Sequence, residues 1–256
     1  MNYYKNILSL KKKLVFIVGG SGLIGKDAIK CLVSYKAKVV NLDIKKFHNF
    51  KNNEFFDCSD TKNLEENYLK IIKKYGIPDV FINCSYPRTF DWKLNTFQNI
   101  KKESFNTNLQ NHLNSYVLLS ILTANLMKNK KRKGSIVLLG SIYGVVGQDT
   151  EIYNNTGMNE NITYSVIKGG VTNFTKQMAS YYGKFNIRIN CICPGGIIDK
   201  INSNNKIFIK NYKKRVPLKR LAKSREIANV ILFFSSDASS YITGNIMMVD
   251  GGWTSI

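Results

Sequence analysis

The stretch LVFIVGGSGLIG, residues 14–25, decides the fold. Its first part, Leu14–Val18, is a short continuous apolar run, which is typical of a strand buried on both faces of a sheet. The glycines that follow, from Gly19 to Gly25, permit a tight turn and a close approach of the backbone to a bound pyrophosphate. A helical pattern then runs through Leu32, and a helix N-terminus offers free N–H groups to a phosphate. The stretch therefore predicts a strand, a phosphate-binding turn and a helix.

The alternation of strand and helix continues along the rest of the chain. Further strands are predicted at Lys38–Asp43, Glu54–Asp57, Asp79–Asn83, Ser135–Leu139, Ile187–Cys193 and Ile246–Val249. Helical patterns lie at Leu64–Lys74, Phe105–Met127, Tyr164–Tyr182 and Glu226–Ser235. Strands that alternate with helices form βαβ units, so we predict an α/β Rossmann fold with a doubly wound parallel sheet of about seven strands flanked by helices.

No linker-like change of composition divides the chain, which predicts a single domain over residues 1–256. We expect its cofactor half at residues 1–140, where the phosphate-binding turn lies. The least regular stretches, residues 144–163 and 196–221, both follow predicted strands. Because α/β sheets bind ligands beyond the carboxyl ends of their strands, we expect these two segments to shape a substrate pocket.

Asp43 ends the strand that follows the Gly-rich turn. Its carboxylate is suited to accept hydrogen bonds from an adenosine ribose 2′-OH and to repel a 2′-phosphate, which predicts NAD as the cofactor in preference to NADP. Lys45 and Lys46 lie close by and could soften this preference. The alternative is that Asp43 only caps a turn at the end of the strand.

The composition adds a strong positive charge. The 256 residues hold 38 Lys and Arg against 17 Asp and Glu, a formal net charge of +21. The basic residues are scattered among many Asn and Ile, and clusters such as Lys11–Lys13 and Lys213–Arg215 are short. This distribution favours a solvated basic surface, which can also attract anionic substrates, over a nucleic-acid footprint. A non-catalytic nucleic-acid-binding module remains as an alternative of another class.

Cysteine, histidine and hydropathy patterns bear on the compartment. The five cysteines are odd in number and form no Cys-x-x-Cys pair, so we expect a reducing cytoplasm rather than a disulfide framework. The two histidines are too few for a convincing metal cluster, and we predict no bound metal. The longest apolar helical stretch, Tyr116–Met127, is interrupted by polar residues and is shorter than the roughly 20 residues of a membrane span. We therefore expect a soluble cytoplasmic protein.

Tyr164 and Lys168 form a candidate catalytic pair. They lie four residues apart on a predicted helix, so they share one face of it. A tyrosine with its ordinary pKa of ~10 is a poor acid or base at neutral pH unless a cation stabilises its phenolate. We expect Lys168 to supply that cation, and a lowering of the tyrosine pKa by ~3 units would be worth about 4 kcal/mol. Ser141, just after the predicted strand Ser135–Leu139, can bond a substrate carbonyl or alcohol that faces the tyrosine.

With these residues in place, the chain resembles the short-chain dehydrogenase/reductase family over nearly its whole length. The matching motifs run in order: the turn Gly19–Gly25, Asp43, Asp57-Cys58, Asn83-Cys84-Ser85, Asn111 to Tyr116, Ser141, Tyr164, Lys168, Pro194-Gly195-Gly196-Ile197, Gly244 and Val249-Asp250-Gly251-Gly252. The resemblance implies an NAD(P)-dependent oxidoreductase of the Rossmann fold that works as a homotetramer or homodimer.

The resemblance also implies roles. Tyr164 would be the general acid/base, and Lys168 would lower its pKa and hold the nicotinamide ribose. Ser141 would orient the substrate, and Asn111 would hold a water molecule in a proton relay. The cofactor-binding residues would be Tyr164 and Lys168 together with Gly19, Ser21, Leu23, Ile24, Gly25, Asp43, Asp57, Cys58, Asn83, Pro194, Gly195 and Ile197, the last of which would help to fix the carboxamide.

The sequence departs from the family pattern in several places. Val18 stands where a threonine is usual, Leu23 where a third glycine is expected, and Asn114 where the Asn111 stretch has a glycine. The separation of Ser141 from Tyr164 is longer than usual. We expect the extra residues, within 147–161, to shape the substrate pocket.

Three details resemble one branch of the family, the oxidoreductases of flagellin modification and legionaminic-acid-like sugar biosynthesis. They are the turn GGSGLIG, the run Ser85-Tyr86-Pro87-Arg88, and Ser141-Ile142-Tyr143-Gly144 followed by Glu151-Ile152-Tyr153. The implied substrate is a phosphorylated or nucleotide-linked sugar, with Arg88, Tyr86 and Tyr143 as candidate substrate contacts. The guanidinium of Arg88 can grip a phosphate or carboxylate. The alternative within the family is a 3-oxoacyl carrier-protein reductase.

Overall fold

The computed structural model describes residues 4, 6–199 and 202–256. Its strands are β1 (Leu14–Val18), β2 (Lys38–Asp43), β3 (Asn53–Phe55), β4 (Val80–Asn83), β5 (Gly134–Leu139), β6 (Ile187–Pro194) and β7 (Ile246–Val249). They form one seven-stranded sheet in the order β3-β2-β1-β4-β5-β6-β7, with every neighbouring pair parallel. The predicted Rossmann fold is confirmed. Lys200 and Ile201, within the predicted segment 196–221, lie outside the described residues.

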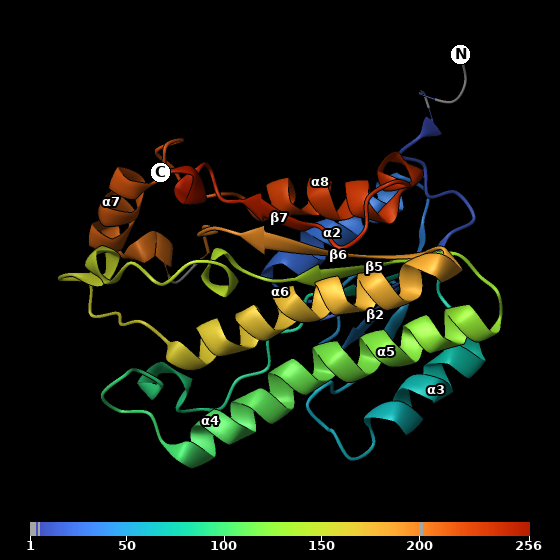
Figure 1. The fold of residues 1–256 in the computed structure, drawn as a ribbon, viewed down its shortest axis with the longest axis horizontal. Coiled ribbons are helices and arrows are strands. Elements are labelled where there is room, and N and C mark those ends of the chain that lie inside the picture. Colours follow the sequence, from blue (N-terminus) through green and yellow to red (C-terminus); the bar gives the residue numbers. More distant parts are fainter. Residues whose placement is uncertain (1–3, 5, 200–201) are drawn as a thin grey trace.

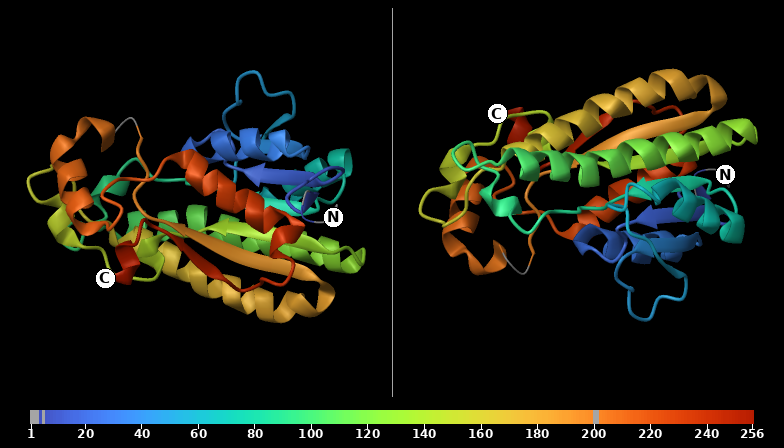
Figure 2. Two further views of the ribbon diagram at one scale, coloured as in Figure 1. Left: turned by 90° about the horizontal axis from the view of Figure 1, so that it is seen from above. Right: turned by 90° about the horizontal axis from the view of Figure 1, so that it is seen from below.

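Helices cover both faces of the sheet (Figures 1 and 2). One face carries α2 (Leu23–Ser34) and α8 (Ser224–Ser235), and the other carries α3 (Leu64–Tyr75), α5 (Asn114–Asn129) and α6 (Ile162–Tyr182). Among the described residues, none of these helices has the length and apolar character that crossing a bilayer requires.

The two helix layers explain why β1 is apolar throughout. Successive side chains of a strand point to opposite faces of the sheet. Phe16 and Val18 belong to the core cluster beneath α3 and α5, whereas Val15 and Ile17 belong to the cluster beneath α2 and α8. Both sets of side chains are buried, so no position of the strand can be polar without cost.

The long helix predicted at Phe105–Met127 is divided in the structure. α4 (Lys102–Asn108) runs into a π-helical turn at Leu109–Leu113, and α5 follows from Asn114. Hydrophobic periodicity over this region does not reveal one wider turn, because such turns are rare and short. The turn directs His112 to the interior, where it is fully buried.

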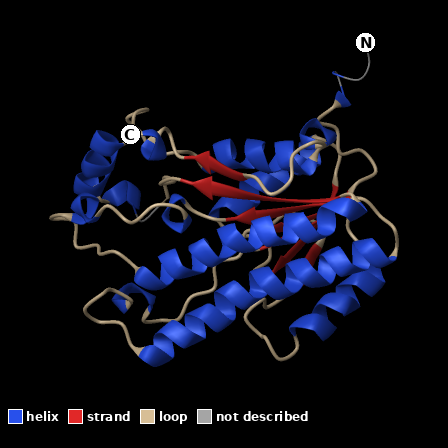
Figure 3. Ribbon diagram, in the orientation of Figure 1, coloured by secondary structure: helices blue, strands red, loops and turns tan. Residues whose placement is uncertain are grey.

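The segment 196–221 was predicted to be irregular, but it contains the helix α7 (Lys206–Arg215). The buried residues of this helix are Phe208 and Tyr212, which share an apolar cluster with Ile152 and Trp253. The rest of α7 is dominated by lysine and other polar or exposed residues, so it leaves almost no periodic signal in the sequence. Figures 1 and 3 show α7 beyond the arrowheads of the strands, at the end where α/β sheets bind ligands.

The sheet has a topological switch point between β1 and β4. The chain places β2 on one side of β1 and β4 on the other. Gly19, directly after β1, has φ +77° and packs so closely on the segment after β4 that a Cβ would lie 2.7 Å from Cα of Ser85. Ligands of open α/β sheets bind in the crevice at such a point.

Candidate active site

Tyr164 and Lys168 lie on the first turns of α6, and Ser141 lies at the carboxyl end of β5. Asn161 caps α6, because its side chain accepts a hydrogen bond of 2.8 Å from the backbone N–H of Tyr164. Ser141 is buried, and its hydroxyl accepts from the N–H of Tyr143 at 3.2 Å. Gly144 lets this loop lie directly on α6, since a Cβ there would be 2.5 Å from the carbonyl oxygen of Lys168. The three predicted residues are therefore brought to one place.

Lys168 is almost completely buried, at 4% exposure. Its ammonium donates to the carbonyl oxygen of Leu139 at 2.8 Å and lies 3.3 Å from Nε2 of His112. It also lies 4.8 Å from the centroid of the Tyr116 ring, within range of a cation–π contact. Burial lowers the pKa of Lys168 to about 8, because a low dielectric disfavours the charged form.

The pKa of Tyr164 moves opposite to the prediction. Burial raises it to about 12, although a hydrogen bond from Ser141 acts in the lowering direction. The predicted lowering by Lys168 is wrong in this structure. The reason is geometric: Nζ of Lys168 lies 5.8 Å from the Tyr164 ring centroid and directs its hydrogen bonds to Leu139 and His112.

An aromatic wall borders Tyr164. Its ring lies edge-on to Tyr86, with centroids 5.8 Å apart, and to Trp92, with centroids 6.3 Å apart. Two of the predicted substrate residues lie together, with Cζ of Arg88 4.8 Å from the centroid of the Tyr86 ring. Sequence reasoning missed Trp92, which lies in a short turn at Trp92–Leu94. The loop after β4 also holds Tyr86 and Phe90, and nothing in the residue pattern shows that Trp92 is the buried one of the three. Tyr143 is placed differently, beside Trp253 in the apolar cluster of α7.

The π-helical turn presents His112, not Asn111, to Lys168. Asn111 is only partly buried, and its side chain makes no hydrogen bond to another described residue. Its predicted role in a proton relay therefore stays a prediction. His112 escaped the sequence analysis because it was considered only as a metal ligand.

The Gly-rich turn fits a dinucleotide. A Cβ at Gly25 would lie 2.4 Å from the carbonyl oxygen of Gly19, so the turn and the start of α2 require a glycine here. No side chain caps the first turn of α2, which leaves its N-terminal N–H groups open to a phosphate. Asp43 accepts hydrogen bonds of 2.9 Å from the backbone N–H groups of Ser21 and Lys45. It thus caps the turn, and each carboxylate oxygen keeps lone-pair capacity for a ribose hydroxyl.

Of the other predicted cofactor residues, several first support the protein itself. Asn83 is fully buried and accepts hydrogen bonds from the N–H and hydroxyl of Ser85, which fixes the end of β4. One oxygen of Asp57 accepts from Ser59. Burial raises the pKa of the Cys58 thiol to about 11. Ser21, Leu23 and Ile24 lie in the turn and at the start of α2, and Pro194, Gly195 and Ile197 lie at and beyond the end of β6.

Comparison with known proteins decides the family. A family profile described as enoyl-(acyl carrier protein) reductase matches residues 54–254. The chain belongs to the short-chain dehydrogenase/reductase family. It is 32% identical to the post-translational flagellin modification protein A of Campylobacter coli, over 95% of this chain and 99% of that protein. This relative confirms the predicted resemblance to flagellin-modification oxidoreductases.

Two further members extend the comparison. A 3-oxoacyl-[acyl-carrier-protein] reductase of Buchnera aphidicola subsp. Schizaphis graminum is 30% identical over 96% of this chain and 98% of that protein. A crystal structure of a short chain dehydrogenase from Leptospira borgpetersenii with bound NAD⁺ is 35% identical, with a TM-score of 0.85 over 96% of this chain and 94% of that one. As a member of this family, the protein is an oxidoreductase that uses NAD or NADP.

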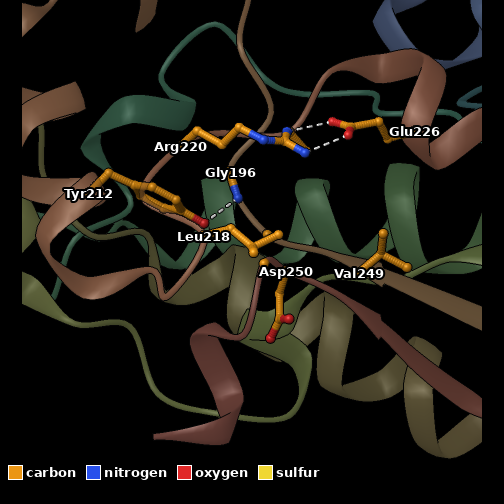
Figure 4. A pocket seen from close by; sticks show the side chains of 10 residues that line it. Gly196, Tyr212, Leu218, Arg220, Glu226, Val249 and Asp250 are labelled. Carbon is orange, nitrogen blue, oxygen red and sulfur yellow. Dashed lines mark hydrogen bonds and ion pairs between the residues drawn. The ribbon is translucent and has the colours of Figure 1, made fainter.

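In this dehydrogenase/reductase, hydrogen bonds hold the segment 196–221 that follows β6. A cavity of about 100 Å³ lies there, lined among others by Gly196, Tyr212 and Asp250 (Figure 4). The Tyr212 hydroxyl accepts a hydrogen bond from the N–H of Gly196. Arg220 donates to both carboxylate oxygens of Glu226 at 2.8 and 2.7 Å, and this hydrogen bonding lowers the pKa of Glu226 to about 2. The first bond closes the predicted substrate segment on itself just beyond β6, and the second ties the segment to α8.

The exposed side of α7 forms a basic groove, which we call the α7 groove. It is a shallow depression of about 530 Å³, largely open to solvent, and is lined by Lys206, Ile209, Lys210, Lys213, Lys214 and Lys219. No acidic residue lines it among the described part of the chain. A concave surface lined by one sign of charge raises the local concentration of ligands of the opposite sign.

Proposed function

We propose that this protein is an NAD-dependent oxidoreductase that interconverts a carbonyl group and a secondary alcohol on an anionic sugar derivative, in flagellin or surface-glycan modification. The observation that carries the proposal is the convergence of Ser141, Tyr164 and buried Lys168 beyond the carboxyl end of β5. The most direct test is a cofactor-reduction and cofactor-oxidation screen against a panel of sugar phosphates and nucleotide sugars.

The residues divide the chemistry between them. Tyr164 donates a proton to the carbonyl oxygen in reduction and accepts it in oxidation. Its pKa of about 12 keeps the phenol protonated at neutral pH, which is the form that reduction requires. Ser141 bonds the same substrate oxygen, and Lys168 keeps a positive charge near the tyrosine. When bound, NAD supplies the site that accepts or releases hydride.

Asp43 supports the choice of NAD. Its carboxylate lies at the end of β2, held by the N–H groups of Ser21 and Lys45, at the position that contacts the adenosine ribose in Rossmann folds. A 2′-phosphate placed there would meet a fixed negative charge.

Replacement of Asp43 tests this preference. In Asp43→Asn we expect the ratio of NADP to NAD affinity to rise by about tenfold, ~1.4 kcal/mol, because the charge is lost while one acceptor oxygen remains. Asp43→Ala should also weaken NAD binding, because the two backbone N–H groups lose their acceptor. Titration of both cofactors measures the ratio. Tighter NADP binding by the wild type, or an unchanged ratio in both variants, would contradict the assignment.

Three observations support an anionic sugar derivative. Arg88 lies exposed over Tyr86 at the edge of the aromatic wall, and aromatic faces commonly pack against the apolar face of a sugar ring. The α7 groove presents positive charge on the predicted substrate segment. The relative from Campylobacter coli is a flagellin modification protein.

Arg88 provides the test of the anion. We expect Arg88→Ala to lower kcat/KM by roughly one to two powers of ten, about 1.5–3 kcal/mol, if the guanidinium grips a phosphate or carboxylate. Arg88→Lys keeps the charge but loses the planar fork, so it should restore activity only in part. Cofactor affinity should stay unchanged. Equal kinetics of all three proteins at high ionic strength, where the general field is screened, would remove Arg88 from the site.

A second candidate function is the reduction of a 3-oxoacyl carrier protein. The Buchnera relative has that name, and the lysines of the α7 groove would suit an acidic carrier protein. Turnover of a 3-oxoacyl carrier-protein thioester with no turnover of any sugar in the screen would favour this candidate. Salt-sensitive binding to random DNA with no dinucleotide binding would instead favour the nucleic-acid-binding alternative.

A further inference from the structure

His112 contacts the candidate catalytic lysine directly. It lies on the π-helical turn Leu109–Leu113 and is fully buried. Its Nε2 atom is 3.3 Å from Nζ of Lys168, and the same ammonium donates to the carbonyl oxygen of Leu139 at 2.8 Å. An imidazole and a backbone carbonyl therefore hold the ammonium from two directions.

The protonation state of the imidazole follows from this contact. A charged lysine has only donors, so Nε2 of His112 must accept and the ring proton must be on Nδ1. Burial and the positive charges of Lys168 and Arg88 hold the pKa of His112 well below its ordinary value. Nδ1 is buried without a hydrogen-bond partner among the described residues. An unpaired buried donor costs free energy and calls for an explanation other than stability.

We propose that His112 is the positioning residue of Lys168: its neutral imidazole holds the ammonium in its charged form beside Tyr164. This proposal rests on the proposed function, in which Tyr164 and Lys168 act together. A lysine has three N–H donors, of which Leu139 and His112 take two and leave one for the cofactor or substrate. The family resemblance implied that Asn111, on the same turn, would hold a water molecule in a proton relay. In the proposal the imidazole of His112 contacts Lys168 directly.

The pairing of His112 with Lys168 depends on pH in a definite direction. The titratable and charged groups around it are Tyr86, Arg88 and Cys84 after β4, Tyr116 on α5, Tyr164 on α6, and Cys191 and Cys193 on β6. Protonation of His112 would place two cations 3.3 Å apart and remove the acceptor, so the pairing is lost in acid. Removal of the acceptor favours neutral Lys168, so the pKa of the lysine should fall in a variant without it.

Nuclear magnetic resonance of the full chain tests the pairing without any substrate. A long-range ¹H–¹⁵N spectrum reports the tautomers of the two histidines, and His48→Gln removes the exposed one and identifies the other. We expect His112 to carry its proton on Nδ1 and to stay neutral at pH values below the ordinary ~6.5. A proton on Nε2, or titration of His112 near its ordinary pKa, would overturn the proposal.

Two substitutions of His112 test its hydrogen-bond acceptor and its ring separately. His112→Gln can place an amide oxygen near the position of Nε2, whereas His112→Phe keeps a ring and removes the acceptor. Lysine labelled with ¹³C at Cε reports the pKa of each lysine, and the Lys168 signal is identified as the one that is missing in Lys168→Met. In His112→Gln the pKa of Lys168 should stay near the wild-type value. In His112→Phe it should fall by roughly one unit, the effect of one charge-assisted hydrogen bond. Equal pKa values in the wild type and His112→Phe would overturn the proposal.

Kinetics connect the pairing to turnover. With a substrate from the sugar-phosphate and nucleotide-sugar panel, His112→Phe should lower kcat by about 10- to 100-fold with little change in KM, and shift the alkaline limb of the pH profile downward. His112→Gln should recover most of kcat. If His112→Phe does not fold, the wild-type tautomer still decides. If the resonance results hold while Tyr164→Phe turns over normally, the pairing stands and the proposed function fails.

Discussion

Tyr164→Phe is expected to lower kcat by about 10²- to 10⁴-fold, the range that general acid–base catalysis contributes. The substitution keeps the ring against Tyr86 and Trp92, at centroid distances of 5.8 and 6.3 Å, and removes only the hydroxyl. The variant therefore lacks the phenol proton that lies next to Ser141 and that reduction needs. Steady-state kinetics in both directions measure the loss.

The binding of NAD should survive this change, because the Gly-rich turn and Asp43 lie on the other half of the sheet from α6. Titration of NADH fluorescence checks the affinity. Tyr181→Phe is a matched control, since Tyr181 is exposed on the same helix and should leave kcat unchanged. Turnover of Tyr164→Phe at a rate near that of the wild type would show that the acid/base is another group.

The sequence was sufficient for those parts of the fold that repeat. β1 is apolar at every position because it lies between two helix layers. The alternation of strands and helices predicts a parallel sheet, and β1 pairs in parallel with β2 and β4. Tyr164 and Lys168 could be placed on one face by their spacing of four residues. Ser141 could be placed beside them because parallel strands end at the same edge of a sheet.

What could not be predicted depends on single turns and on contacts between distant segments. Asn111 and His112 both lie within the wider turn at Leu109–Leu113, and it is His112, rather than Asn111, that contacts Lys168 there. The helix α7 is specified by two buried aromatic residues, Phe208 and Tyr212, whose partners are far away in the sequence. The direction of the Tyr164 pKa shift depends on burial, which residue spacing does not report.

Replacement of Lys168 should damage both turnover and cofactor binding. Lys168→Ala removes the positive charge near Tyr164 and leaves Leu139 and His112 without their donor. We expect kcat to fall by about 10²- to 10⁴-fold and NAD affinity to fall as well, in contrast to Tyr164→Phe. Lys176→Ala, an exposed lysine on the same helix, is the matched control. Wild-type NAD affinity in Lys168→Ala would separate the lysine from the cofactor.

The pH dependence of stability gives an independent test of how deeply this lysine is buried. The folded protein releases the Lys168 proton at a pKa of about 8, against an ordinary value of 10.5. Between these values the unfolded chain binds more protons than the folded one, so the free energy of unfolding rises with pH. Below the lower value Lys168 is charged in both states, so this rise is absent. The difference of about 2.5 units corresponds to roughly 3 kcal/mol in total. Lys168→Met, which fills a similar volume without a charge, lacks this rise.

The free energy of unfolding, measured by denaturant titration from pH 7.5 to 10.5, should therefore increase in the wild type relative to Lys168→Met. Parallel curves for the two proteins would mean that Lys168 keeps its ordinary pKa and remains accessible to water.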